Sequence, residues 1–404
     1  MRDAFVPQPV MGKSPRELRA YVDGLDPTTD KPVMQAIIEG LTRPFGDDEV
    51  QKTTYTRTTP RFVDADSDDH LHQLFLDNQW TDGLPILLPT EERVAAMLAC
   101  TSHSPDEVVG RMRPTLFREA WEYTVEKVAV NAVMAGARPA YFPVILALAA
   151  TQISARGSTS SSAAAMVVVN GPIRQQIGMN WGIGAMGPYS HANATIGRAY
   201  GLLSQNLQGG SIVGETYMGS QGNAYSFNNV TVAENEEGSP WEPFHVEQGF
   251  SREESTVSVF GSARHTAFTL GLPHDHWQAH VRRMLLGMDP LERPLFVLDP
   301  IAARQFVERG GFDTKAKLAE WAYATAQIPA AEYWAHQLIQ NYVYPRATFG
   351  EEPYASMLKA APDELVHMFP RQAIHTIVVG GETNGYYRIF GAGYAKTISV
   401  DAWR

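Results

Sequence analysis

The spacing of apolar and polar residues predicts strands that alternate with helices along most of the chain. Residues 166–170 form a short apolar run that ends at a polar turn, and residues 192–203 follow as a predicted helix. A glycine-rich passage, residues 178–187, connects the two. This central segment therefore predicts a strand, a loop and a helix in that order.

The same alternation continues toward the C-terminus. Three further strands and two further helices are predicted: residues 253–263, 294–300 and 375–380, and residues 301–309 and 315–326. Apolar strands interleaved with helices are typical of a mixed sheet with buried central strands. We therefore expect an α/β fold in which a mixed, largely buried β-sheet is flanked by helices.

Residues 1–70 differ from the rest because proline and threonine are frequent and only residues 14–22 and 33–41 have the pattern of short helices. We expect an extended N-terminal arm here. Residues 71–404 are expected to form an α/β domain of catalytic type that can divide further near residue 270. Because an arm of this length often wraps a neighbouring subunit, we expect a homo-oligomer.

Charge and composition exclude some partners. The 404-residue chain has a formal net charge of −11 and no basic block, which argues against a nucleic-acid partner or a polybasic membrane patch. No apolar run approaches the roughly 18 residues of a membrane span, and the N-terminus lacks an apolar signal core. We expect a cytoplasmic protein without a membrane partner.

The chain has a single cysteine, Cys100, at the end of a predicted helix. An intramolecular disulfide or a cysteine-cluster metal site is therefore impossible. Because Leu98 and Ala99 precede it, we interpret Cys100 as a packed small side chain and not as a nucleophile.

The glycine-rich passage predicts an anion site. Glycines let backbone N–H groups approach a ligand, and the first turn of a helix leaves N–H groups without partners. Asn193 and Arg198 in the following helix would add polar contacts. The alternative is that these glycines only allow close backbone packing.

Acid–base chemistry is predicted for the stretch 233–245. Glu234, Glu236 and Glu237 are candidate acids and bases, and Trp241 lies in a proline-stiffened turn that would supply an aromatic wall. The helix at 124–136 is apolar on nearly every side, so we expect Lys127 to be buried there and to carry a functional charge. A structural ion pair is the alternative for Lys127.

Three other places carry candidate ligands. Asp82 precedes a glycine in a turn, where it contacts a ligand or makes an Asx-turn hydrogen bond. Gly381 follows a predicted strand, where backbone N–H groups would line a pocket. His265 and His276 are an alternative metal pair, although surface histidines are commoner. No other cofactor is predicted.

Several longer motifs carry a family resemblance. They are Trp80-Thr-Asp-Gly-Leu-Pro, Pro89-Thr-Glu-Glu-Arg-Val, Val125-Glu-Lys-Val-Ala-Val-Asn-Ala-Val-Met-Ala-Gly, Tyr141-Phe-Pro-Val, Val169-Asn-Gly-Pro-Ile, Ala192-Asn-Ala-Thr-Ile-Gly-Arg-Ala and Ala233-Glu-Asn-Glu-Glu-Gly-Ser-Pro-Trp-Glu-Pro. With these motifs the chain resembles the large domain of the UGSC family of (seleno)proteins, strongly over residues 74–260 and weakly beyond.

The resemblance implies a thiol-disulfide oxidoreductase-like class, because relatives carry a selenocysteine or cysteine motif in a separate small domain. That motif is missing here, and Ala137 stands where relatives often have a cysteine. Both departures count against a thiol redox mechanism. His191 stands where relatives have an arginine, which implies an altered ligand.

These observations predict a cysteine-independent enzyme that acts on a small polar or anionic molecule by acid–base chemistry, as a lyase, hydratase or hydrolase. The predicted substrate-binding residues are Asp82, Asn131, Asn170, His191, Asn193, Arg198, Asn235, Trp241 and Gly381. Two alternatives stay open: an oxidoreductase component whose redox residue belongs to a partner protein, and a non-catalytic binding subunit.

Overall fold

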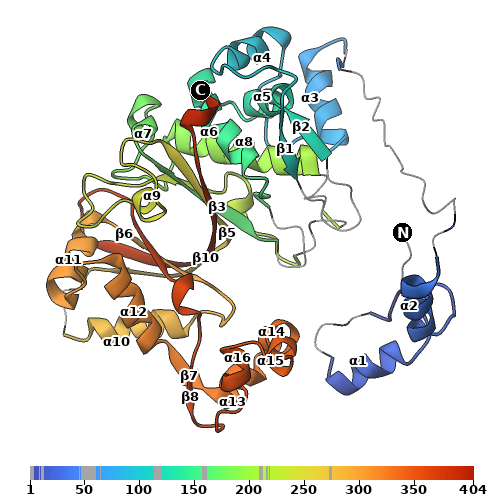
Figure 1. The fold of residues 1–404 in the computed structure, drawn as a ribbon. Coiled ribbons are helices and arrows are strands. Elements are labelled where there is room, and N and C mark those ends of the chain that lie inside the picture. Colours follow the sequence, from blue (N-terminus) through green and yellow to red (C-terminus); the bar gives the residue numbers. More distant parts are fainter. Residues whose placement is uncertain are drawn as a thin grey trace. The chain divides into compact units, whose positions relative to one another are not determined.

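The computed structural model describes residues 4–8, 10, 13–44, 46, 61–63, 65–112, 121–156, 162–208, 213–214, 217, 219–272 and 275–404. The chain divides into two compact units: Met1–Asp64 with Trp334–Ala361, and Ala65–Tyr333 with Pro362–Arg404. Figure 1 traces the elements of both units. Among the helices of the described residues, none combines the length and the apolar character that crossing a bilayer requires.

The smaller unit is helical. Its helices are α1 (Pro15–Val22), α2 (Val33–Thr42), α14 (Gln337–Tyr342), α15 (Tyr344–Thr348) and α16 (Tyr354–Met357), and α13 (Ala330–Ala335) spans the boundary between the units. Ser14 and Glu17 form a capping box at the start of α1, in which each side chain accepts a hydrogen bond from the other's backbone N–H. The two short helices predicted near the N-terminus are confirmed.

The larger unit is built on a six-stranded mixed sheet with the order β4-β3-β5-β10-β6-β9. Its strands are β3 (Ala164–Asn170), β4 (Val230–Ala233), β5 (Thr256–Leu270), β6 (Pro294–Leu298), β9 (His375–Val378) and β10 (Tyr386–Ser399). The outer pairs β3–β4 and β6–β9 are parallel, and the inner pairings are antiparallel. Every residue of β3, β4 and β6 is buried, which confirms the predicted mixed, largely buried sheet.

The sheet curls until its two edge strands meet at their carboxyl ends. Asn235, just after β4, donates its backbone N–H to the carbonyl of Val378 in β9 at 2.7 Å. All six strands contribute residues to one apolar core: Met166, Val168, Val230, Val232, Phe260, Ala263, Leu295, Val297, Ile377, Phe390 and Ala392. Because the sheet is curled, the apolar side chains on its inner face pack against one another.

Helices cover the other face in two groups (Figure 1). The first group is α4 (Glu91–Leu98), α5 (Val125–Met134), α6 (Phe142–Ala150) and α8 (His191–Gln208), which pack on β3 and β5 in the main core, with α3 (Asp68–Asp77) beside them. The second group is α10 (Trp277–Leu286), α11 (Pro300–Gly310) and α12 (Lys315–Thr325). Aromatic rings such as Phe296, Phe306 and Tyr387 join this second group to β6 and β10.

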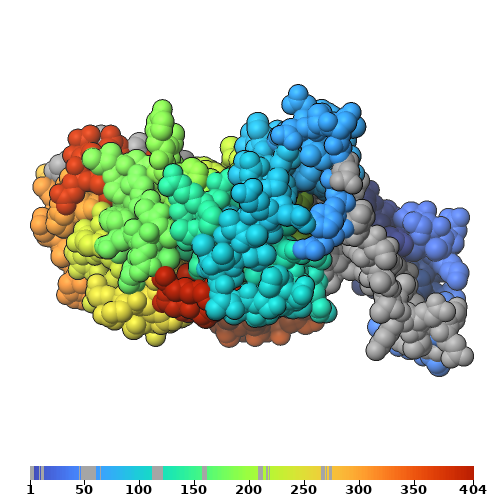
Figure 2. Space-filling view, turned by 90° about the horizontal axis from the view of Figure 1, so that it is seen from above, coloured from blue at the N-terminus to red at the C-terminus, as the bar shows by residue number. Residues whose placement is uncertain are grey.

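Short elements complete the unit. They are β1 (Val108–Met112), β2 (Trp121–Thr124), β7 (Gln327–Pro329), β8 (Leu365–His367), α7 (Ile173–Gln176), α9 (Phe244–Glu247), and the 3-10 turns Pro139–Tyr141, Ala224–Ser226, Arg371–Ala373 and Asp401–Trp403. Figure 2 shows the C-terminal residues in red between yellow and cyan surfaces. There Trp403 stacks on His103 at 4.7 Å between ring centroids, and Asp401 accepts the Ser255 N–H at 2.9 Å. The last turn therefore ties two distant segments together.

The two halves of the sheet have the same connectivity. In each half a first strand pairs in parallel with a strand outside it, and a long antiparallel strand returns on its inner side: β3, β4 and β5, then β6, β9 and β10. Each long strand contains a Phe-Gly pair followed by small residues: Phe260-Gly-Ser-Ala in β5 and Phe390-Gly-Ala-Gly in β10. Asn170 ends the first strand of one half, and Asp299 directly follows the first strand of the other. These two polar residues therefore hold matching places in the fold.

Candidate functional site

Polar residues gather at the carboxyl ends of both parallel strand pairs. Asn170 and Glu234 stand at the ends of β3 and β4, and Asp299 and Gly381 stand beyond the ends of β6 and β9. Ligands of open α/β sheets bind at this end of the strands. The two ends are nevertheless built differently, since the first is filled by side chains and the second contains a cavity.

Arg174, in α7, ties the acidic turn after β4 to the turn after β3. Its guanidinium donates to the backbone carbonyls of Gly171 and Glu234 at 3.0 and 2.6 Å. It also contacts the carboxylates of Glu236 and Glu237 at 3.1 and 3.0 Å. Partial burial raises the pKa of Glu237, but the hydrogen bonds from Arg174 outweigh it and leave that pKa below its ordinary value. Arg174 thus stabilises Glu237 in its ionised form and holds Glu236 beside it.

A second network surrounds the fully buried carboxylate of Glu234. Its Oε1 lies 3.3 Å from the Nζ of Lys315, and its Oε2 accepts from Asn170 Nδ2 at 2.6 Å and from Phe244 N at 2.7 Å. The same ammonium lies 3.2 Å from Glu247, whose pKa burial raises to about 7 against the opposing charge of Lys315. The carboxylates predicted as acid and base are therefore held in internal ion pairs.

His375, at the start of β9, packs among aromatic rings. Its centroid lies 5.7 Å from that of Phe244 and 5.5 Å from that of Tyr394. Burial, and then the charges of Lys315 and Arg293, lower the pKa of His375 to about 4. Because the unfolded chain takes up this proton near pH 6.5, the contribution of His375 to stability is present above that pH and is lost as the pH falls toward 4.

We predict that His375→Phe removes this acid sensitivity. Relative to the wild type, the variant should gain at most about 3 kcal/mol of unfolding free energy between pH 6.5 and 4, measured by denaturant titration at each pH. The raised pKa of Glu247 acts in the opposite direction over about pH 4.5 to 7, but it is present in both proteins and cancels in the difference. Parallel pH profiles for the two proteins would contradict a neutral, half-buried His375.

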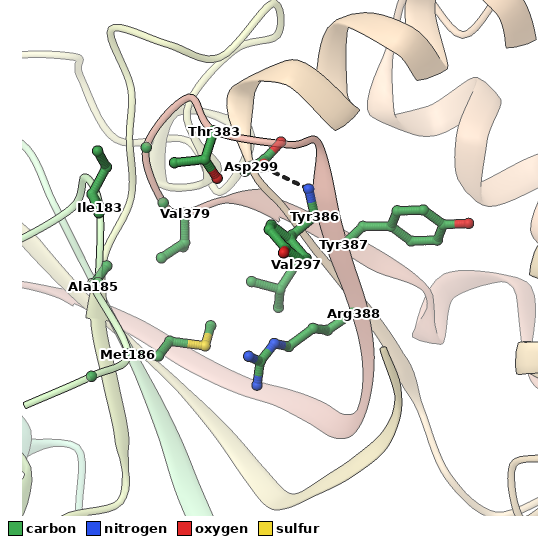
Figure 3. A pocket seen from close by; sticks show the side chains of 14 residues that line it. Ile183, Ala185, Met186, Val297, Asp299, Val379, Thr383, Tyr386, Tyr387 and Arg388 are labelled. Atoms are coloured by element: carbon green, nitrogen blue, oxygen red, sulfur yellow. Dashed lines mark hydrogen bonds between the residues drawn. The ribbon is translucent and has the colours of Figure 1, made fainter. Parts of the chain in front are cut away.

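A cavity of about 440 Å³ opens at the carboxyl ends of β6 and β9. The loop at 183–187 forms one wall, and the turn after β9 and the start of β10 form the other. Its charged lining residues are Asp299 and Arg388. In Figure 3 the Arg388 side chain points into the cavity toward Met186, whereas the ring of Tyr387 points away from it.

Close backbone packing forms the glycine wall of this cavity. A Cβ on Gly381 would lie 2.4 Å from Ile183 Cγ1 and 2.7 Å from the Ile183 nitrogen, so a side chain has no space there. Gly380 has a φ of 115° and donates its N–H to the carbonyl of Trp181 at 2.9 Å. Gly381 therefore lines the cavity as predicted from its place after a strand, and close approach of the two loops requires it.

Asn193 shapes the loop and does not face the cavity with a free amide. Its Oδ1 accepts from Asn180 N at 3.0 Å, and its Nδ2 donates to the carbonyls of Asn180 and Ala185 at 2.8 and 3.2 Å. Asn235 has a similar role, because its Nδ2 donates to Gly380 O at 2.8 Å. Both predicted binding residues thus hold cavity walls in place.

Asp299 combines a structural role with a place in the cavity. Its Oδ1 accepts from Ala302 N at 2.8 Å and caps α11, and its Oδ2 accepts from Tyr386 N at 2.6 Å (Figure 3). The backbone N–H groups of Ile301 and Gly385 also interact with this carboxylate. Burial raises the pKa of Asp299 against the lowering effect of these backbone N–H groups. Such a carboxyl group is suited to carrying a proton.

The expectation that Lys127 is buried is wrong. Helix α5 packs into the main core through Val128, Ala129 and Ala132, but Lys127 lies on its exposed edge. Lys127 lines neither the cavity at β6 and β9 nor a second cavity that contains Asp82. A lysine on the solvent side of an otherwise apolar helix keeps its ammonium hydrated, which composition alone did not reveal. Asn131 is buried on this helix, where its Nδ2 donates to the Lys127 carbonyl at 2.9 Å.

Asp82 and Arg198 pair with each other, away from the glutamates. Arg198 donates from Nε and Nη2 to the two oxygens of Asp82 at 2.9 and 2.8 Å, and Leu84 N donates to the same carboxylate at 3.2 Å. Burial raises the pKa of Asp82, but the hydrogen bond from Arg198 and its charge leave it below its ordinary value. Arg198 therefore does not reach back to the glycine-rich loop, and Asp82 lines a second cavity of about 560 Å³.

Trp241 and His191 do not line the first cavity. Trp241 is buried and donates its indole N–H to the Phe312 carbonyl at 2.8 Å, so it anchors the acidic turn and forms no open wall. His191 is exposed at the start of α8, and its ring centroid lies 5.8 Å from that of Tyr141. The residues expected to form one binding site thus lie at several separate places in the structure.

The metal alternative has no support in the described part of the chain. His276 is exposed, and the side chain of His265 lies outside what the structure describes. No group of three or more His, Cys, Asp or Glu residues there is arranged to hold a metal ion. Cys100 is half-buried and packs against the main core, in line with its apolar neighbours.

In comparisons with protein-family models, curated proteins and solved structures, nothing matches this chain. Its function is therefore inferred from the geometry of the cavity at β6 and β9. Asp299 and Arg388, its charged residues, were not among the sequence predictions. The match between Asn170-Gly171-Pro172-Ile173 and Asp299-Pro300-Ile301 was the available signal for Asp299.

Proposed function

We propose that the protein is an enzyme that binds a small carboxylate-containing molecule at β6 and β9 and catalyses a proton transfer on it, as a lyase, hydratase or hydrolase. One observation carries the proposal: a guanidinium, Arg388, and a carboxyl group of raised pKa, Asp299, line the same cavity of about 440 Å³. Few polar groups converging in a largely apolar pocket are typical of small-molecule sites.

The two residues have separate roles in this proposal. Arg388 binds the carboxylate of the substrate, since a guanidinium presents paired donors to a planar anion. Asp299 takes a proton from the substrate or returns one, and its backbone hydrogen bonds hold it in position. The glutamates after β4 and Lys127 have no part, because the former are internally paired and the latter is exposed.

The test does not require a known substrate. The protein is incubated in D2O with a panel of small hydroxy acids, keto acids and dicarboxylic acids, and NMR detects deuterium at carbons beside the carboxyl or carbonyl group, or new products. Asp299→Ser, which still caps a helix, should slow the reaction by about 100-fold or more. Arg388→Gln should weaken binding by at least about tenfold.

Arg252→Gln is the matched control, because this arginine lies on the surface in an ion pair with Glu242 at 2.8 Å. It should react like the wild type. Equal rates for Asp299→Ser, Arg388→Gln and the control would contradict the proposal. Absence of exchange, product and binding across the whole panel would contradict it as well.

We also infer a relationship to the UGSC family from the motifs quoted above. Contacts between motifs support this inference: Asp82 pairs with Arg198, and Asn170 pairs with Glu234 and Glu236. The redox role implied for that family would need a thiol or selenol on a partner protein. Activity retained by Cys100→Ala in the D2O test would agree with the proton-transfer proposal.

A further inference from the structure

The second cavity lies at the opposite ends of β3 and β4 and has a different character. Its volume is about 560 Å³, and the segments that precede these strands line it, together with the end of α3. Its charged lining residues are Asp82 and Arg156. Neither is used by the function proposed for the cavity at β6 and β9.

The charges of the described residues around this cavity do not balance. Asp82 is fully engaged by the two-point hydrogen bonds of Arg198 and by two local donors, Thr81 Oγ1 and Leu84 N. Arg156 is only 6% exposed and has no carboxylate within ion-pair distance in the described part of the chain. Among the described residues, the carboxylate whose charge acts on Arg156 is Asp82, which already pairs with Arg198. Two positive charges thus share one negative charge there, which is unfavourable for the buried Arg156 unless an anion binds.

Arg156 is held rigidly while part of its guanidinium stays uncommitted. Its Nε donates to Ser226 O at 2.9 Å and its Nη1 to Gln205 Oε1 at 2.7 Å. Both acceptors are neutral, and among the described residues Nη2 has no hydrogen-bond partner. Gly201 makes room for the group, because a Cβ there would lie 2.9 Å from Nη2. Such a preorganised donor is what a carboxylate requires.

Large apolar side chains open to solvent stand around the same cavity. Leu76, Val213 and Phe227 all line it and are 44%, 80% and 50% exposed. Exposed apolar groups around a pocket mark a surface that a ligand covers. We infer that this cavity is a second ligand site for an organic monocarboxylate, whose carboxylate binds Arg156 and whose apolar part lies against Leu76 and Phe227.

The probe is 3-phenylpropionate, and titration calorimetry of the full chain measures its binding. We expect one equivalent to bind, with the uncharged 3-phenylpropanamide and the small acetate ion each weaker by at least about tenfold. Arg156→Gln should lose binding by a similar factor. One equivalent corresponds to a single site, the cavity that contains Arg156, which is separate from the cavity at β6 and β9.

Two further variants make the assignment specific. Leu76→Trp narrows the cavity from an exposed helix position and leaves Arg156 in place, so it should block binding even if Arg156→Gln fails to fold. Arg388→Gln alters only the cavity at β6 and β9 and should bind the probe like the wild type. Failure of the D2O test leaves these expectations unchanged.

Several results would overturn the inference. The amide binding as tightly as the acid would remove the role of charge. Probe binding that survives Leu76→Trp, or that disappears in Arg388→Gln, would place the ligand elsewhere. The same holds if the wild-type protein shows no binding up to about 10 mM probe.

Discussion

Replacing Lys315 by methionine is expected to destabilise the protein by about 3–5 kcal/mol. Lys315 is only 6% exposed, and its ammonium lies 3.3 Å from the fully buried carboxylate of Glu234. Methionine keeps the apolar stem of the side chain but removes that ammonium. Among the described residues, that carboxylate would retain two neutral donors, Asn170 Nδ2 and Phe244 N. Urea titration of the variant and the wild type measures the difference.

Lys317→Met is the matched control on the same helix. Its ammonium pairs with Asp313 at 2.7 Å, but 59% of the side chain is exposed, so its loss should cost less than about 1 kcal/mol. Adding Glu234→Gln to Lys315→Met should recover part of the lost stability, because a neutral amide then replaces the fully buried carboxylate that has lost its partner. Equal effects of the two lysine variants would show that the Lys315 pair does not stabilise the fold.

The sequence pattern predicted those elements whose apolar spacing is local and regular. β3, α8, β6, α11 and β9 all lie where the alternation of strands and helices placed them. Helix caps are local as well, since Thr90 and Thr314 accept hydrogen bonds from the N–H groups of Arg93 and Lys317. These features depend on neighbours within a few residues, which is why one sequence suffices for them.

β10 was missed, although it lies at the centre of the sheet. It carries Gly391 and Gly393, where side chains are replaced by close contacts with Glu292 and Arg293 from another segment. Its pairing with β5 also shifts register at three places. Both features weaken the two-residue alternation that signals a strand, and both have their cause in distant parts of the chain.

The candidate site was predicted in its loops and missed in its charges. The glycine-rich loop and Gly381 do line one cavity, because glycines at such turns report on close backbone approach. Which cation becomes buried depends on how helices pack. Lys127 and Lys315 both lie near the start of a helix, yet only Lys315 meets a carboxylate from β4. Local periodicity contains no information on that partner.

Gly171→Ala is expected to destabilise the protein by more than about 4 kcal/mol, or to prevent folding. Gly171 has a φ of 80°, and a Cβ there would lie 2.2 Å from Glu254 O and 2.8 Å from the Cα of Ser255. Backbone atoms cannot yield as a flexible side chain can. The turn after β3 would have to move, and with it the N–H that Gly171 donates to Glu236 at 2.8 Å.

Gly178→Ala separates packing from backbone conformation. Gly178 has a φ of 66° and nothing within 4 Å of its would-be Cβ, so the variant should cost only about 1–2 kcal/mol for a left-handed alanine. Denaturant titration of both variants decides the question. A large gap assigns Gly171 to the close approach of β3 and the segment before β5, while equal costs would mean that positive φ alone requires glycine there. A larger cost for Gly171→Ala would explain why the acidic turn after β4 is fixed against the end of β3. The carboxylates of that turn then stabilise the fold and do not act on a substrate.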